Sequence, residues 1–401
     1  MCRRLLMMAL LSAAFILMVA DSVLAQTVGQ GTAELFQYHR GMDVFFMLML
    51  VAFLMLFIKR YQWGVCLATL LVFAVAWPLY LLIHSEFLGL SLGIEAAIQA
   101  AFAAITLVIA IGVFLGHIST IHYILTAVLF VPAYMFNEWF MFGYLAGVAD
   151  AGGSILVHVF AAYWGLGVAM GLRNPSVADE PKRTTVHSVS FVWLASMLLL
   201  VLWPSFVTAL LPANEVIPAM INCFLALTAS VLTTYLACYL LQRKIDPLVY
   251  TYAILAGGVA IGATVNLVTP LTAWIIGALG GIISTLSFIY VDGWLHRRTG
   301  VLDTMGVHNL HGVPGIFGGL VAMVVAGAPG SQAVAVLGAI LIGLVTGIGS
   351  GVVLRVFPRP ELMLDDAEAF PMEEARSGEA DVAEPTPAMA AAGSSMVRET
   401  S

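Results

Sequence analysis

The stretch DAGGSILVH at residues 150–158 is matched later in the chain by DTMGVHNLH at residues 303–311. In both copies a Gly follows the first Asp by three residues, and a His follows it by eight. Each copy begins a long apolar stretch, and an ionisable side chain inside a membrane segment is costly to bury and is therefore a candidate for function. The closing residues of the two copies, His158 and His311, are the first candidates for a functional site.

The composition indicates a protein that crosses a membrane many times. Of the 401 residues, 61% are hydrophobic and only 10% are charged, whereas a soluble core shows amphipathic patterning. The four Cys have no motif spacing, so the sequence indicates neither a disulfide framework nor a metal site. Nothing suggests an enzymatic reaction, a cofactor or a nucleic-acid partner. Eleven apolar runs are long enough to span a bilayer, at about 42–60, 63–84, 93–116, 122–142, 152–172, 187–211, 216–241, 248–268, 271–291, 304–327 and 332–356.

The positive charges set the expected orientation, because loops rich in Lys and Arg stay in the cytoplasm. The loops between these basic ones carry no Lys or Arg. We therefore expect the first mature helix to begin outside a cell (plasma) membrane and the C-terminus to be cytoplasmic. The basic residues lie in alternate loops and beside the last span: Lys59, Arg60, Arg173, Lys182, Arg183, Arg243, Lys244, Arg297, Arg298, Arg355 and Arg359.

Three segments are expected along the chain. Residues 1–25 combine two Arg, a short apolar run and a small-residue site, which is typical of a signal peptide, with an uncleaved extra helix as the alternative. Residues 26–357 hold the spans. Residues 358–401 turn to Glu, Ala, Pro and Ser, and such a segment cannot bury enough apolar surface to fold alone. We predict a disordered cytoplasmic tail there, with docking of a cytoplasmic regulator as the alternative.

The two copies of the repeated sequence predict an inverted repeat. They lie on the fifth and tenth predicted spans, and five is odd, so the second half runs through the membrane upside down. Asp150 is then at the outer face and Asp303 at the inner face. Each His lies eight residues deeper, about 12 Å along a helix, so both reach the centre of a ~30 Å core. The predicted fold is all-α, with five plus five spans and a final helix.

The four residues have different expected roles. An Asp at a helix start accepts free backbone N–H groups, and we expect this for Asp303. Asp150 could do the same or could also attract an approaching cation, and the sequence does not decide between these. Desolvation keeps His158 and His311 mostly neutral. One ring can then donate an N–H to the other, which offers donors and acceptors to a small neutral solute.

The residues around both histidines resemble the ammonium transporter/Rhesus (Amt/Rh) family, particularly its Rh branch. The segment NLHGVPG at 309–315 carries the closest similarity, and the similarity extends from about residue 38 to residue 356. Further similar segments are QYHRGMDV at 37–44, Asn137-Glu138, WPSF at 203–206, LAGGVAIG at 255–262 and GGIISTLSFIY at 280–290.

This resemblance implies a homotrimer in membrane lipid, with one ammonia pore per subunit. The family's twin histidines correspond to His158 and His311, and its two phenylalanines at the outer entrance correspond to Phe102 and Phe206. The chain has no clear equivalent of the tryptophan in the Amt outer aromatic cage, which implies weaker, Rh-like recruitment of ammonium. His308 is expected to pack at the inner mouth or at a helix contact.

The sequence therefore predicts a passive channel in which ammonium loses its proton at an outer vestibule and ammonia passes the histidines. One alternative is a carbon dioxide or general gas channel of the same architecture. A second is an ammonium sensor, although the tail contains no recognisable output domain. A membrane cytochrome with histidine-ligated haem would need histidines separated by the width of a haem, and no further paired membrane histidines are found.

Overall fold

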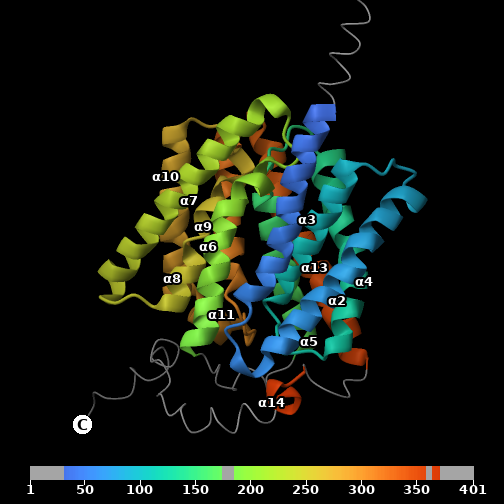
Figure 1. Cartoon of the computed structure of the whole chain (residues 1–401), viewed down its shortest axis with the longest axis vertical. Coiled ribbons are helices and arrows are strands. Elements are labelled where there is room, and N and C mark those ends of the chain that lie inside the picture. The colour runs from blue at the N-terminus through green and yellow to red at the C-terminus, as the bar shows by residue number, and fades with distance from the viewer. Residues whose placement is uncertain (1–30, 174–184, 358–363, 371–401) are drawn as a thin grey trace, which may run out of the picture.

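The computed structural model describes residues 31–173, 185–357 and 364–370 (Figure 1). These residues are almost entirely helical, and no β-strand occurs among them. A first helix covers residues 31–54, and ten further helical segments are long and apolar enough to cross a membrane. The predicted eleven-span, all-α fold is confirmed. The proposed signal peptide at 1–25 lies outside the described residues.

The ten further spans follow the predicted order, and several combine an α-helix with a short π-helical or 3-10 segment. Before the second span, η1 covers Lys59–Tyr61. The spans are α2 (Gln62–Leu82) with η2 (Ile83–Phe87), α3 (Ile94–Ile111), α4 (Thr120–Glu138) with η3 (Trp139–Tyr144), η4 (Ser154–Val159) with α5 (Phe160–Leu172), α6 (Val186–Thr208), α7 (Ala213–Gln242), α8 (Pro247–Ala253) with α9 (Ala256–Ile261) and η6 (Gly262–Thr264), α10 (Pro270–Leu286) with η7 (Ser287–Val291) and α11 (Asp292–Thr299), η8 (His308–Gly312) with α12 (Val313–Val325), and α13 (Pro329–Val356).

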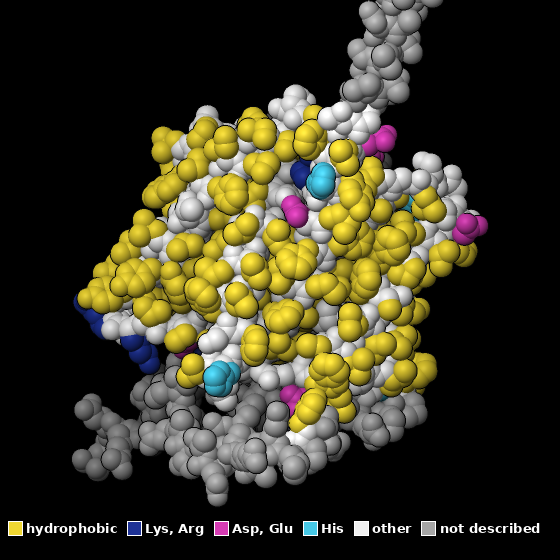
Figure 2. All heavy atoms as spheres, viewed as in Figure 1, with side chains coloured by type: hydrophobic (Ala, Val, Ile, Leu, Met, Phe, Trp, Pro, Cys, Tyr) yellow, Lys and Arg dark blue, Asp and Glu magenta, His cyan; other side chains and the backbone are white. Residues whose placement is uncertain are grey.

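The surface agrees with a molecule surrounded by lipid. On the face drawn in Figure 2, hydrophobic side chains cover the middle of the bundle, and the largest group of visible Lys and Arg lies at its lower edge. Large apolar side chains such as Val201 and Leu271 are 66% and 70% exposed. Such contiguous apolar exposure is unstable in water and indicates burial in a membrane or against another chain.

Glycines bring two spans into backbone contact. A Cβ on Gly347 of α13 would lie 2.3 Å from the carbonyl oxygen of Trp164 on α5, and one on Gly351 would lie 2.3 Å from that of Val168. A Cβ on Gly171 of α5 would approach Ile348 in the same way, at 2.4 Å. Small residues permit this close packing where lipid supplies no hydrophobic driving force between helices. The eleventh span therefore packs tightly against the span that carries His158.

Part of the segment at 358–401 is folded, in contrast to the expectation of a wholly disordered tail. Residues Asp366–Ala369 form a helical turn, α14. The carboxylate of Asp366 accepts the backbone N–H groups of Gln62 and Trp63, at the start of α2. Arg60 donates to Asp365 at 2.7 Å. The start of α2 has free backbone donors, and Asp366 accepts two of them. Residues 358–363 and 371–401 lie outside the described part.

Candidate functional site: a histidine pair between two π-helical segments

The two copies of the repeated sequence begin in the same way in space. The carboxylate of Asp150 accepts the backbone N–H groups of Ile155 and Leu156 at 2.7–3.0 Å. The carboxylate of Asp303 accepts those of the residues four and five positions later, at 2.9 and 2.7 Å. Both Asp therefore stabilise the start of a helical segment. Burial raises the pKa of the Asp150 carboxyl, and the bonds from Leu156 and Ile155 act against this rise.

The Gly at the third position after each Asp has a backbone role. Gly153 has a φ of 71° and Gly306 a φ of 68°, in the left-handed region that favours glycine. A Cβ on Gly153 would lie 2.6 Å from a methyl carbon of Val157, and one on Gly306 would lie 2.3 Å from the ring of Phe288. The repeated spacing is thus a turn that lets each carboxylate reach the amides that follow.

Each turn leads into a π-helical segment that carries one of the two histidines. His158 belongs to η4 and His311 to η8, and π-helical turns within α-helices are frequent at functional sites. The two Nδ1 atoms are 3.0 Å apart, and the rings are nearly parallel with centroids separated by 5.0 Å. Both side chains are buried, and the Nε2 atom of His158 has no hydrogen-bond partner. The two histidines thus form a direct hydrogen-bonded pair.

Two aromatic side chains contact His158, and a third contacts one of those two. The ring of Trp203 stacks on His158, with centroids 5.7 Å apart and an angle of 21°. Phe206, one turn further along α6, has its ring 6.2 Å from that of His158. Phe206 in turn contacts Phe102 of α3 at 4.7 Å, with the rings tilted by 47° rather than parallel. We call Phe102 and Phe206 the phenylalanine pair.

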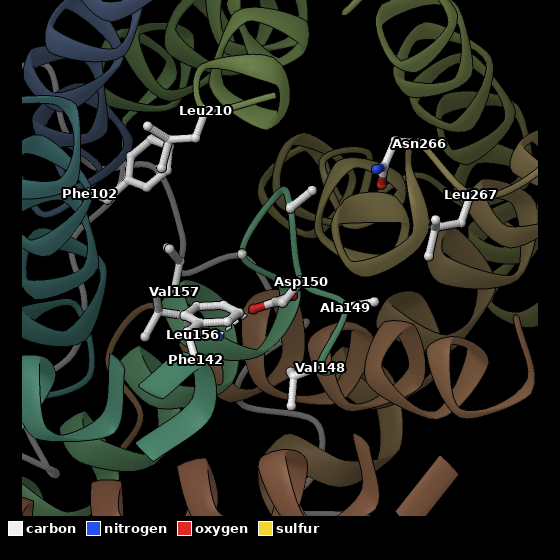
Figure 3. Close-up of a pocket in the computed structure, with 12 residues that line it drawn as sticks. Phe102, Phe142, Val148, Ala149, Asp150, Leu156, Val157, Leu210, Asn266 and Leu267 are labelled. Atoms are coloured by element: carbon white, nitrogen blue, oxygen red, sulfur yellow. Dashed lines mark hydrogen bonds between the residues drawn. The ribbon is translucent and has the colours of Figure 1, made fainter. Parts of the chain in front are cut away.

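A pocket of about 400 Å³ lies at the end of the bundle where Asp150 lies, and Phe102 is part of its wall. In Figure 3, Phe102 and Leu210 line one side of this pocket and Asn266 lines the opposite side. Asp150 is also part of the wall. The side-chain amide of Asn266 donates to Glu215 at 2.7 Å, which places a second carboxylate behind the wall.

Polar side chains also lie on the other side of the histidine pair, toward Asp303. The hydroxyl of Tyr163 on α5 is 3.5 Å from Nε2 of His308 on η8. The neighbouring Asn309 is held by two side-chain bonds: it donates to Asp292 at 2.9 Å and accepts from Ser287 at 2.7 Å. These bonds fix the first turn of η8, which carries both His308 and His311.

The structure brings together His158, His311 and the phenylalanine pair, and it separates the two Asp residues at the starts of η4 and η8. Sequence reasoning did not single out Trp203 or the pocket residues Phe142 and Asn266. Trp203 lies in the WPSF segment, so its position three residues before Phe206 was a usable signal. Asn266 follows η6 at the end of a span and has no local signal in the sequence. Among the described residues, no group of three or more His, Cys, Asp or Glu could hold a metal ion.

Comparison with known proteins agrees with this geometry. The model of the Ammonium Transporter Family matches residues 6–327. The chain belongs to this family. Its relatives include the zebrafish (Danio rerio) ammonium transporter Rh type C-like 2, 33% identical over 316 residues that cover 76% of this chain and 64% of the relative. The mouse (Mus musculus) ammonium transporter Rh type A is 32% identical over 338 residues, which cover 79% of this chain and 77% of the relative.

Solved structures show the same family architecture. The Rh50 protein of Nitrosomonas europaea, described as one of the Rhesus protein family of channels, is 34% identical, and the match has a TM-score of 0.82. It covers 87% of this chain and 96% of the Rh50 chain. A sensor Amt protein shares the fold with a TM-score of 0.73 at 20% identity, over 89% of this chain and all of that one. The chain is therefore a multi-pass membrane protein of the ammonium transporter family, whose named relatives are transporters and channels.

Proposed function

We propose that the protein is a passive ammonia channel whose pore passes first the phenylalanine pair and then the histidine pair. The observation that carries the proposal is the 3.0 Å contact between His158 and His311 in the buried interior of a membrane-spanning bundle. Such a neutral, hydrogen-bonding passage suits a small polar molecule and opposes a desolvated cation. The named activity of the Rh-type relatives supports ammonium as the external substrate.

The pocket at the Asp150 end is proposed as the outer vestibule. Its wall combines Asp150 and Asn266 with aromatic side chains, including Phe102. Carboxylate and amide oxygens attract a cation, and aromatic faces add to this attraction. Ammonium would lose its proton at the phenylalanine pair, because a bare cation is costly in a narrow apolar passage. Ammonia then passes His158 and His311 and regains a proton in the cytoplasm.

The remaining features of the proposal follow from the sequence and the family. We infer a homotrimer in the plasma membrane, with the Asp150 end outside and the Asp303 end in the cytoplasm. Three described basic residues support this orientation: Arg173, Arg297 and Arg355 all lie near the Asp303 end by their places in the chain. Residues 1–25 would be a signal peptide, and the segment after residue 357 would face the cytoplasm, where a regulator could bind it.

The decisive test measures ammonia and carbon dioxide entry separately in vesicles that contain the purified protein. Stopped-flow recording of a pH dye inside the vesicles should show faster alkalinisation with ammonia than in protein-free vesicles. Carbon dioxide instead acidifies the interior, so the two cargos give opposite signals. Faster acidification without faster alkalinisation would contradict the ammonia channel and support a carbon dioxide channel instead. No acceleration with either gas would favour an ammonium sensor.

The histidine pair is tested by replacing His158 and His311 together with Leu. We expect ammonia or methylamine flux to collapse, because Leu offers no donor or acceptor in place of the imidazole nitrogens. The measurement is flux in proteoliposomes, with size-exclusion chromatography to show that the oligomer still assembles. Undiminished flux in the double variant would show that the pore lies elsewhere.

A further inference from the structure

We propose that Tyr163 and His308 form a second hydrogen-bonding station for ammonia on the cytoplasmic side of the histidine pair. This inference rests on the proposed function and adds two residues to its pore. Tyr163 follows His158 by five residues on the span that runs inward, and His308 precedes His311 by three on the span that runs outward. Both therefore lie closer than the histidine pair to the Asp303 end.

The two side chains meet across the same interface that holds the histidine pair. The Tyr163 hydroxyl and His308 Nε2 are 3.5 Å apart, and the rings lie edge to face with centroids 5.8 Å apart. A Cβ on Gly312, next to His311, would contact His308 at 3.5 Å and Ala162 at 3.1 Å. Gly312 thus lets the two spans pack closely at the level between His311 and His308.

The exposure and the hydrogen-bond partners of Tyr163 and His308 are those of a site that a small molecule can bind transiently. His158 and His311 are buried, whereas Tyr163 and His308 are both partly exposed. The Nδ1 atom of His308 is itself buried without a hydrogen-bond partner. The 3.5 Å separation is at the long limit of a hydrogen bond, so the Tyr163–His308 contact is weak enough to be replaced by contacts to a small molecule.

The internal repeat shows that this polar pair exists in one half of the pore. His158 and His311 are 153 residues apart in the sequence. The same shift relates Tyr163 to Ile316 in the second half and His308 to Ile155 in the first half. The outer counterparts of the pair are thus two isoleucines, and the outer approach is instead occupied by the phenylalanine pair. The pore is apolar before the histidines and polar after them, which matches a path that strips a proton on entry and returns the molecule to water on exit.

Ammonia fits the chemistry of this station. It can accept a hydrogen bond from the Tyr163 hydroxyl while it donates one to a nitrogen of His308, because the neutral imidazole always offers one bare nitrogen. The nitrogen of ammonia can lie ~2.9 Å from both the Tyr163 hydroxyl oxygen and Nε2 of His308, because these two atoms are 3.5 Å apart. The bonds of Asn309 to Asp292 and Ser287 hold the backbone of His308 in place for this contact.

The test compares Tyr163→Phe, His308→Leu and His308→Gln with the wild-type full chain in proteoliposomes, by stopped-flow ammonia flux. Tyr163→Phe removes only the hydroxyl, and we expect it to lower flux about fivefold, as the loss of one hydrogen bond does. His308→Leu should lower flux by at least as much. His308→Gln should retain more flux than His308→Leu, because Gln keeps an acceptor and donors. The double variant Tyr163→Phe/His308→Leu should lose less than the product of the two single losses, since both residues serve one molecule.

Ile316→Val, at the position equivalent to Tyr163 in the other half, is the matched control and should conduct as the wild type does. Wild-type flux in both Tyr163→Phe and His308→Leu would overturn the station, and so would equal losses in His308→Gln and His308→Leu. The failure of the proposed function has a different signature. In that case wild-type vesicles themselves would take up ammonia no faster than protein-free vesicles.

Discussion

At the scale of single residues, two aspartates that look alike in sequence have the same local structure. Each carboxylate accepts two backbone N–H groups of the helical segment that it precedes. The sequence predicted this for Asp303 and left Asp150 open between a capping role and recruitment of a cation. The bonds are those expected of the first role for both residues, and the place of Asp150 in the pocket wall keeps the second role as a proposal.

Replacing Asp303 or Asp150 with Ala should destabilise the protein by roughly 1–3 kcal/mol, because buried amide donors are then left without acceptors. The measurement is thermal unfolding of the detergent-solubilised protein. The Asn variants should lose less stability, since one acceptor oxygen remains. Glu86→Gln is the control: its carboxylate is exposed, and we expect a change within about 0.5 kcal/mol. An Asp303→Ala protein as stable as the wild type would contradict the capping role.

The same variants separate the two proposed roles of Asp150. If the carboxylate also attracts ammonium, Asp150→Asn should reduce flux at low ammonium concentration more than Asp303→Asn does, at matched protein stability. Loss of a fixed negative charge weakens the local attraction of cations. Equal flux in the two Asn variants would leave Asp150 with the capping role alone. The measurement is the concentration dependence of ammonia flux in proteoliposomes.

At the scale of helices, the apolar runs predicted which segments span, and all eleven predicted spans correspond to helical segments. The sequence did not predict the π-helical segments, because a change from α to π hydrogen bonding depends on contacts with other spans. The close approach of α5 and α13 was also not predicted from the sequence. Its glycines are visible in the sequence, but only the packed structure shows which of them face the partner helix.

Two glycines of α13 test this packing. Gly347→Ala should destabilise the protein by about 1–3 kcal/mol, because the new Cβ would lie 2.3 Å from the carbonyl oxygen of Trp164. Gly349→Ala places its Cβ in open space and should be neutral or slightly stabilising, since Ala favours a helix interior over Gly. Thermal unfolding in detergent measures both. Similar melting temperatures for the two variants would contradict the backbone contact between α5 and α13.

At the scale of the whole molecule, the order and class of the fold were accessible from sequence because apolar length and charge distribution are whole-chain properties. The candidate site was accessible in part. His158 and His311 follow from the repeat, and the resemblance to known channels supplied Phe102 and Phe206. Trp203, Tyr163 and the pocket lining depend on which spans pack together, and a single sequence does not specify those pairs.

The orientation of the molecule can be measured with reporter fusions in bacteria. Alkaline phosphatase fused after Phe357 should be inactive and green fluorescent protein at the same point should fluoresce, because we place this end in the cytoplasm. Alkaline phosphatase fused after Gly327, between α12 and α13, should be active and serves as the control. The reversed pattern of activities would invert the topology and exchange the proposed outer and inner sides.

The hydrogen bond between the two Nδ1 atoms limits how charge can travel through the molecule. Each neutral imidazole carries one N–H, so only one ring can donate to the other, and the free Nε2 atoms then differ: one is bare and the other carries hydrogen. A proton transferred along the pair would leave each ring with its hydrogen on the other nitrogen. A second proton could not follow in the same direction until the rings rotated. Trp203, stacked on His158, opposes such turning. A neutral molecule would leave the tautomers unchanged, so in the proposed ammonia channel the pair would need no reset between successive molecules.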